Sequence, residues 1–283
     1  MTRSDAGRPN NVLRSARAIS FMIAMAPLPR AFVFALALGI VATVGRAQIA
    51  IVSSYTENFN SLGTALPSGW AVWTSSTSSG NGTAFTWSGA QIANNASFSA
   101  GTAFRNLPGA SQTWSASLSS GSDRALGWRG DSAAARDGSI TFTLSNTLGY
   151  DFTGLSFKAF TPNSSGSAAT IQFQYQIGTS GTFTNFTPTV SYTTVPTTGA
   201  PPLTVTTITL TAADLAVLNN QSSQITFRFD NAATTGTTWN TFALDDFSYS
   251  ATAVPEPAAC AALIGIAAMA GAAWHRRRRN AAS

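Results

Sequence analysis

Cysteine and histidine are almost absent from this 283-residue chain, which contains one of each. Cys260 and His275 both lie near the C-terminus, so the long central region, residues 48–254, can form no disulfide and offers no thiolate. For the same reason this region cannot contain a Ser-His-Asp triad, a Cys-His pair or a His-ligated zinc site. The sequence also lacks a glycine-rich phosphate loop between a strand and a helix.

Charge is scarce in the central region and concentrated at the two ends. The formal net charge is +5, but residues 1–47 carry six Arg against one Asp, and residues 255–283 carry four Arg against one Glu. The central region has six Lys or Arg and nine acidic residues, so its charge is 6 − 9 = −3. A basic surface for nucleic acid is therefore not predicted. Cationic ends beside apolar runs are typical of membrane targeting instead.

The N-terminal segment, residues 1–47, has the pattern of a secretory signal peptide. An apolar run over residues 31–44 follows Arg30 and precedes Gly45 and Ala47, the small residues that signal peptidase requires. The run is too short for a comfortable membrane-spanning helix, although a permanent anchor is the alternative.

Cleavage by signal peptidase is expected after Ala47, which leaves Gln48 as the first mature residue. A signal that starts at Met25 would have an ordinary length, so Met25 is a candidate for the true start of the chain.

The central region contains many short segments in which apolar and polar residues alternate. In TIQFQYQIG, residues 170–178, apolar side chains alternate with three glutamines, which predicts a strand with one buried face and one wet face. SITFTLSN, LTVTTITL and QITFRFDN repeat the pattern, and clusters of Gly, Ser, Pro and Asn separate such segments. Only residues 211–220 have helical spacing, over a length that suits a connection.

These patterns predict an all-β fold, a single antiparallel β-sandwich of jelly-roll-like type over residues 48–252. About 200 residues can close one such core without disulfides. The abundance of Ser, Thr, Gly and Asn would also fit disorder. Six tryptophans lie in this region, however, and the apolar area that they can bury favours an ordered domain.

An uncharged run of 17 residues, 258–274, precedes four arginines near the C-terminus. As a helix it would be about 25 Å long, slightly short of the ~30 Å hydrocarbon layer but able to cross it with flanking residues. Pro255 and Pro257 prevent this helix from extending backward. The arginines favour a cytoplasmic C-terminal end. The sequence thus predicts a C-terminal transmembrane helix, and a simple tail anchor is its plainest interpretation.

The order Val-Pro-Glu-Pro, then an Ala- and Gly-rich helix, then an arginine cluster resembles the PEP-CTERM sorting signal of exported proteins in Gram-negative bacteria. The signal would occupy residues 253–280. The resemblance implies recognition by a membrane-embedded exosortase, a cysteine protease-like transpeptidase, in a cell that makes exopolysaccharide, with the helix as a temporary anchor. The implied recognition residues are Val254, Pro255, Glu256 and Pro257, and the implied stop-transfer cluster is Arg276, Arg277, Arg278 and Arg279.

The central region itself is similar to a group of secreted PEP-CTERM jelly-roll proteins. The similarity is carried by the opening at residues 55–70, by DRALG at Asp123–Gly127, by the turn at Asn146–Gly149 and by DDF at Asp245–Phe247. The chain departs from the group after LSFKAF, where it has TPNSSGS instead of a polar stretch that resembles Glu-Gln-Trp-Arg. No activity is established for that group, so the resemblance implies a fold.

The segment FALDDFSYS places two adjacent aspartates in an expected strand. Alternation puts Phe242 and Phe247 on opposite faces, so either Asp245 or Asp246 points toward a packed side unless a bulge shifts the register. An inward carboxylate is costly unless it is hydrogen-bonded or bound to a cation. One hypothesis is a structural Ca²⁺ site formed by Glu57 with Asp245 or Asp246. Hydrogen bonds from turn amides to the aspartates are the alternative.

The tryptophans offer a second hypothesis, because indole faces can stack on sugar rings. An exposed set would form a polysaccharide-binding face, whereas a buried set would belong to the core, which we expect for most of them. The set is Trp70, Trp73, Trp87, Trp114, Trp128 and Trp239.

The sequence therefore favours an exported, exosortase-sorted protein of the cell surface or extracellular matrix, without enzymatic activity and associated with exopolysaccharide. The alternatives are a carbohydrate-binding module and a polysaccharide-degrading enzyme. A glycosidase needs two carboxylates ~5 Å or ~6.5–9.5 Å apart, and no spacing in the sequence singles out such a pair. The expected partners are signal peptidase, exosortase, the inner membrane and exopolysaccharide, with structural Ca²⁺ as the one cofactor considered.

Overall fold

A computed structural model describes most of the chain between residues 48 and 281. The described ranges are 48–63, 65–87, 104–111, 123–130, 137–162, 167–195, 204–231, 240–255 and 257–281, the last without the side chains of 257–260 and 279–281. The described residues do not include the expected signal peptide with Ala47. They also do not include Trp114, Trp239 and Glu256.

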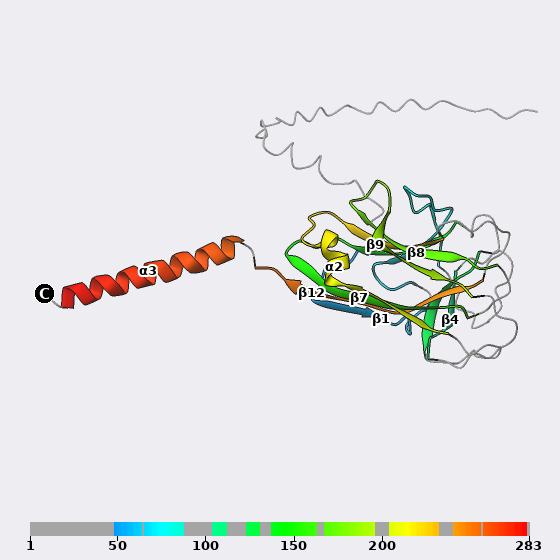
Figure 1. Ribbon diagram of the computed structural model, residues 1–283, viewed down its shortest axis with the longest axis horizontal. Helices are drawn as coiled ribbons and strands as arrows, with labels where there is room; N and C mark the ends of the chain where they lie inside the picture. The colour runs from blue at the N-terminus through cyan, green and yellow to red at the C-terminus, as the bar shows by residue number, and fades with distance from the viewer. Residues whose placement is uncertain are drawn as a thin grey trace, which may run out of the picture. The chain divides into compact units, whose positions relative to one another are not determined.

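The described residues form two antiparallel sheets that face each other as layers (Figure 1). Sheet 1 has the order β10-β7-β12-β5-β4, and β1 also pairs with β12; sheet 2 has the order β3-β2-β6-β11-β8-β9. The strands are β1 (Ser54–Glu57), β2 (Trp70–Thr74), β3 (Thr83–Ala84), β4 (Phe104–Pro108), β5 (Arg124–Trp128), β6 (Ser139–Leu144), β7 (Tyr150–Phe160), β8 (Thr170–Ile177), β9 (Thr184–Thr193), β10 (Thr206–Thr211), β11 (Ile225–Asn231) and β12 (Phe242–Ala253). The expected jelly-roll-like β-sandwich is thus confirmed.

Aromatic side chains fill the space between the sheets. Trp70 of sheet 2 meets Phe247 of sheet 1 edge to face at 5.0 Å between ring centroids, and Phe157 of sheet 1 meets Phe229 of sheet 2 at 4.9 Å. Such rings bury large apolar areas and gain further from this geometry. The aromatic residues whose abundance favoured an ordered domain therefore pack together in one hydrophobic core.

The outer face of sheet 2 is not the wet face that alternation predicts. Gln174 and Gln176 of β8 are buried. Strand β11 places the fully buried Arg228 opposite Gln174, and the loop after β2 bonds to that arginine, whereas Gln176 donates to the Gly181 carbonyl at 2.6 Å. The Arg228 guanidinium donates to Gln174 Oε1 at 2.6 and 3.0 Å and to the Thr77 carbonyl at 2.7 Å. It also lies 3.7 Å from the Phe183 ring centroid. A buried guanidinium is stable only when hydrogen-bond acceptors surround it. The alternation of apolar and polar residues along a strand does not show where such acceptors lie.

The helical spacing over residues 211–220 corresponds to a short connection, α2 (Ala212–Leu215) followed by a 3₁₀ turn at Ala216–Leu218. The Thr211 backbone N–H donates to Asp214 Oδ2 at 2.7 Å, which closes a capping box at the first turn. The prediction of a connecting helix is confirmed.

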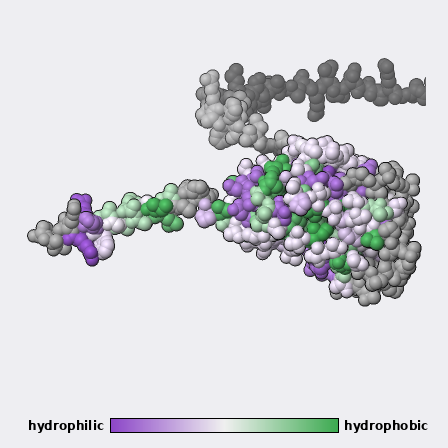
Figure 2. All heavy atoms as spheres, in the orientation of Figure 1, coloured by the Kyte–Doolittle hydropathy of each residue, from purple (hydrophilic) through white to green (hydrophobic). Residues whose placement is uncertain are grey.

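A long helix, α3 (Pro257–Ala281), covers the expected span at residues 258–274. In the described part of the chain, however, no helix is long and apolar enough to cross a membrane. The uncharged run consists largely of Ala and Gly and ends at the arginines. Figure 2 shows this change along α3, from green and pale green to purple.

Candidate functional site

The last strand of the sandwich leads directly into the residues that resemble a sorting signal. Ala253 is paired with Tyr150 of β7, and the Val254 N–H donates to the Gly149 carbonyl at 2.8 Å. Pro255 is exposed and follows that last bond without a linker. Since β12 lies between β7 on one side and β5 and β1 on the other, its removal would break sheet 1.

The arginine cluster lies on the last turns of α3. The side chains of Arg276, Arg277 and Arg278 are exposed, and the Arg278 guanidinium lies 4.3 Å from the Trp274 ring centroid. The side chain of Arg279 is outside the described residues. The cluster thus presents at least three cations at the helix C-terminus, where they are favourable to the helix dipole.

The carboxylates suggested for calcium have separate partners. Glu57 lies opposite Phe247 in the β1–β12 ladder, and its Oε1 accepts the Phe59 N–H at 2.7 Å. Burial raises the pKa of Glu57. Among the described residues, which include Glu57, Asp245 and Asp246, there is no group of three or more His, Cys, Asp or Glu side chains that could hold a metal ion. The structure therefore does not bring the three residues together as a calcium site.

Asp245 is buried and bonded to amides, which is the alternative that the sequence left open. Its Oδ2 accepts the Ala110 N–H at 2.9 Å and its Oδ1 accepts the Asp246 N–H at 2.8 Å. Burial raises the pKa of Asp245 from 3.8 to about 6, despite these bonds. Asp246 points instead to Lys158, with its Oδ2 2.6 Å from Nζ.

A bulge in β12 explains why simple alternation fails here. Between Asp245 and Ser248 the strand has one residue more than β7, and Asp246 takes φ +46°. The extra residue returns Phe247 to the core face that Phe242 occupies, so the expectation that these two rings face opposite sides is wrong.

Two of the segments that resemble secreted jelly-roll proteins are neighbours in sheet 1. Strand β5 carries DRALG and pairs with β12 so that Leu126 lies opposite Leu244, just before DDF. At the start of β5, Asp123 Oδ2 accepts the Ser111 N–H at 2.9 Å, and a Cβ on Gly109 would lie 2.3 Å from its Cγ. The aspartates of both segments therefore hold the same turn after β4.

The third such segment, Asn146–Gly149, is the turn between β6 and β7. Gly149 has φ +74° and donates its N–H to Asn220 Oδ1 at 2.9 Å. The positive φ explains why this position is occupied by glycine, which adopts such a conformation without steric cost.

The described tryptophans belong mostly to the core. Trp70, Trp73 and Trp128 are buried, and Trp87 is half-buried with its indole N–H bonded to the Gly63 carbonyl at 2.9 Å. Three of these four tryptophans are buried, as expected for most of the set, and the four form no exposed stacking platform.

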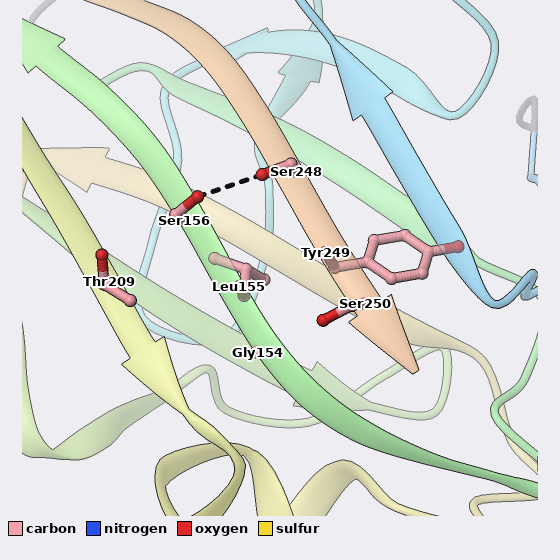
Figure 3. Close-up of a pocket in the computed structure, with 7 residues that line it drawn as sticks. All are labelled: Gly154, Leu155, Ser156, Thr209, Ser248, Tyr249 and Ser250. Carbon is pink, nitrogen blue, oxygen red and sulfur yellow. Dashed lines mark hydrogen bonds between the residues drawn. The ribbon is translucent and has the colours of Figure 1, made fainter. Parts of the chain in front are cut away.

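A shallow hollow on the outer face of sheet 1 was not foreseen from the sequence. Figure 3 shows Ser156, Thr209, Ser248 and Ser250 on three neighbouring strands around it. Its volume is about 230 Å³. We call it the hydroxyl hollow; its lining is Gly154, Leu155, Ser156, Thr209, Ser248, Tyr249 and Ser250.

Strand register brings these hydroxyls together. Thr209 lies opposite Ser156, Ser156 opposite Ser248, and Ser248 opposite Thr56, so four hydroxyl residues form one row across four strands. The Ser156 and Ser248 hydroxyls are 3.0 Å apart and hydrogen-bonded. Alternating Ser and Thr in these segments were a visible signal, but the register that aligns them depends on two bulges.

Comparison with known proteins gives one match of sequence and several of structure. No curated protein matches the chain. The similar solved structures include a family 11 carbohydrate-binding module from Clostridium thermocellum in complex with a β-1,3-1,4-mixed-linked tetrasaccharide, 12% identical over 73% of this chain and 100% of that chain, with a TM-score of 0.36. They also include the K1 cleaved adhesin domain of Lys-gingipain from Porphyromonas gingivalis, 11% identical over 71% and 99%, TM-score 0.37.

A xylan-binding CBM22-1 domain from Paenibacillus barcinonensis Xyn10C is 11% identical over 74% of this chain and 99% of that chain, with a TM-score of 0.37. The sequence match is to the PEP-CTERM protein-sorting motif and covers residues 253–279. The chain thus carries a PEP-CTERM protein-sorting motif directly behind its β-sandwich.

Proposed function

We propose that the protein is exported, held at the membrane by its C-terminal segment and then processed by an exosortase, so that its β-sandwich is delivered to the cell surface or the extracellular matrix. The observation that carries this proposal is the sorting motif at residues 253–279, which begins where β12 ends. A cut beyond Val254 leaves every strand of the sandwich in the product.

The arginines support a direction for this delivery. Three exposed cations at the end of α3 favour retention of that end on the cytoplasmic side, while the sandwich lies on the other side. The near absence of cysteine lets the domain fold outside the cytoplasm without disulfide formation.

We also propose that the delivered domain is not an enzyme and associates with exopolysaccharide. Several described carboxylates already have structural partners: Asp245 binds the turn after β4, Asp246 binds Lys158, and Asp230 lies beside Arg228. The hydroxyl hollow presents Ser and Thr hydroxyls, which can donate to and accept from a hydroxylated ligand. A carbohydrate-binding module within a larger assembly is the second candidate, and the same surface supports it.

The test expresses the tagged full chain in the producing strain and compares it with a variant in which Pro255 and Pro257 are both alanine. The wild-type protein is expected in the surface and matrix fractions, and the variant in the membrane fraction. Equal distribution of the two would contradict sorting by this motif. The matrix-released protein is then incubated with the strain's own exopolysaccharide: saturable co-sedimentation without release of reducing ends supports the proposal, and turnover would contradict it.

A further inference from the structure

We propose that the hydroxyl hollow binds one unit of a neutral sugar chain. This inference rests on the proposed association with polysaccharide and identifies the surface that makes the contact. It follows from the shape of the hollow, the chemistry of its rim and the composition of the surrounding face.

One of the residues that line the hollow, Gly154, has no side chain. Gly154 lies opposite Thr211 on β10 and Ser250 on β12, and its φ is not positive. A Cβ there would meet nothing closer than 3.7 Å, at the Leu210 carbonyl and Ser250 Oγ. Neither backbone conformation nor crowding requires this glycine, although glycine weakens a strand. The glycine keeps its own part of the hollow free of a side chain, and the whole hollow has a volume of about 230 Å³.

The rim of the hollow matches a ligand that both donates and accepts hydrogen bonds. Each Ser or Thr hydroxyl has one donor and two acceptor sites, so the bond between Ser156 and Ser248 leaves capacity for a ligand. Thr209 and Ser250 are exposed on either side of β7. Sugar hydroxyls have the same dual character as these side chains.

Charge favours a neutral sugar over an anionic one. None of the residues that line the hollow is charged. The next row along β7 contains Lys158, and its Nζ lies 2.6 Å from Asp246 Oδ2, so this cation is already compensated. Asp245 adds a further acidic residue beside that pair. A carboxylated sugar would therefore find no free cation in this described part of the face.

The composition of the face disfavours a second protein as its occupant. The large side chains of the lining, Leu155 and Tyr249, are buried in the core at 2% and 3% exposure. Protein interfaces depend on aromatic and other large side chains at their centre. A surface of Ser, Thr and Gly offers hydrogen bonds and a depression, but no such anchor.

The test titrates the full chain, labelled with ¹⁵N-glycine, with xylotetraose, cellotetraose, maltotetraose and the anionic tetragalacturonate, and records amide resonances. Gly154→Val fills the hollow and also identifies the Gly154 resonance by its loss. Thr207→Val is the matched control, because Thr207 is exposed on the same face and outside the lining. Thr209→Val removes one rim hydroxyl and replaces Gly154→Val if that variant does not fold.

A saturable shift of the Gly154 resonance is expected with a neutral oligosaccharide, at a Kd on the order of 1 mM. Gly154→Val is expected to weaken binding at least tenfold, as measured by calorimetry, and Thr207→Val less than twofold. Undiminished binding to Gly154→Val would overturn the hollow as the site while leaving polysaccharide association intact. Three other results would each overturn the inference. The protein would bind only tetragalacturonate, the Gly154 resonance would not shift with any neutral probe at 10 mM, or the wild type would self-associate in a way that Gly154→Val abolishes.

Discussion

Replacement of Asp245 by Asn is expected to stabilise the protein at neutral pH. The carboxylate of Asp245 is 1% exposed and lies between the turn after β4 and the bulge of β12. An Asn side chain has the same shape and retains an oxygen that can accept the Ala110 N–H, while its NH2 group replaces the oxygen that accepts the Asp246 N–H, as the hydroxyl of a protonated Asp would. What the substitution removes is a buried negative charge, which desolvation disfavours.

The magnitude follows from the pKa of Asp245, which burial raises from 3.8 to about 6 in the folded protein. Because the folded state holds this proton more tightly than the unfolded state, the free energy of unfolding falls as pH rises through that window. One unit in pKa corresponds to about 1.4 kcal/mol, so ionised Asp245 lowers the stability at pH 7.5 by up to about 3 kcal/mol. Below about pH 3 both states are protonated and the effect vanishes.

Urea unfolding of the wild type and Asp245→Asn between pH 4 and pH 7.5 measures this difference. The variant is expected to be more stable at pH 7.5 and nearly equal at pH 4. Asp246→Asn is the matched control: its ion pair with Lys158 is exposed, and Asn tolerates positive φ, so a change of about 1 kcal/mol or less is expected. A lower stability of Asp245→Asn at pH 7.5 would refute the reasoning, since it would mean that the charge itself is stabilising.

Three further substitutions test the packing. Arg228→Met leaves Gln174 and the Thr77 carbonyl without their buried donor, and it is expected to cost about 3–5 kcal/mol in urea unfolding; a loss below 1 kcal/mol would show that water replaces the guanidinium. Gly109→Ala places a Cβ 2.3 Å from Asp123 Cγ and is expected to cost about 1–3 kcal/mol. Gly154→Ala, whose Cβ would make only ordinary contacts at 3.7 Å, is expected to gain about 0.5–1 kcal/mol. A similar loss in both alanine variants would contradict this contrast.

The strands and the core were accessible from the sequence because they depend on local alternation and on aromatic content. The β8 segment around Phe173 shows the limit of this approach. Ile171 and Phe173 were recognised as inward residues, although Ile177 of the same predicted face is exposed. The burial of Gln174 depends on Arg228, which lies 54 residues away along the chain. No local pattern carries that contact.

The site residues show the same division. Val254, Pro255 and the arginine cluster are recognisable because the sorting motif is linear. The environments of Asp245 and Gly154 depend on bulges in β12 and β7, and one inserted residue reverses every later side chain on a strand. Alternation therefore placed Phe247 on the wrong face and gave no reason to group Ser156 with Ser248.

Mass spectrometry of the mature protein, purified intact from the surface or matrix of the producing strain, tests the proposed processing most directly. Exosortase processing predicts a C-terminus between Val254 and the start of α3, with all of β12 retained and Arg276–Arg279 absent. A mature chain that still carries the arginine cluster would contradict the proposal, because the C-terminal segment would then be a permanent tail.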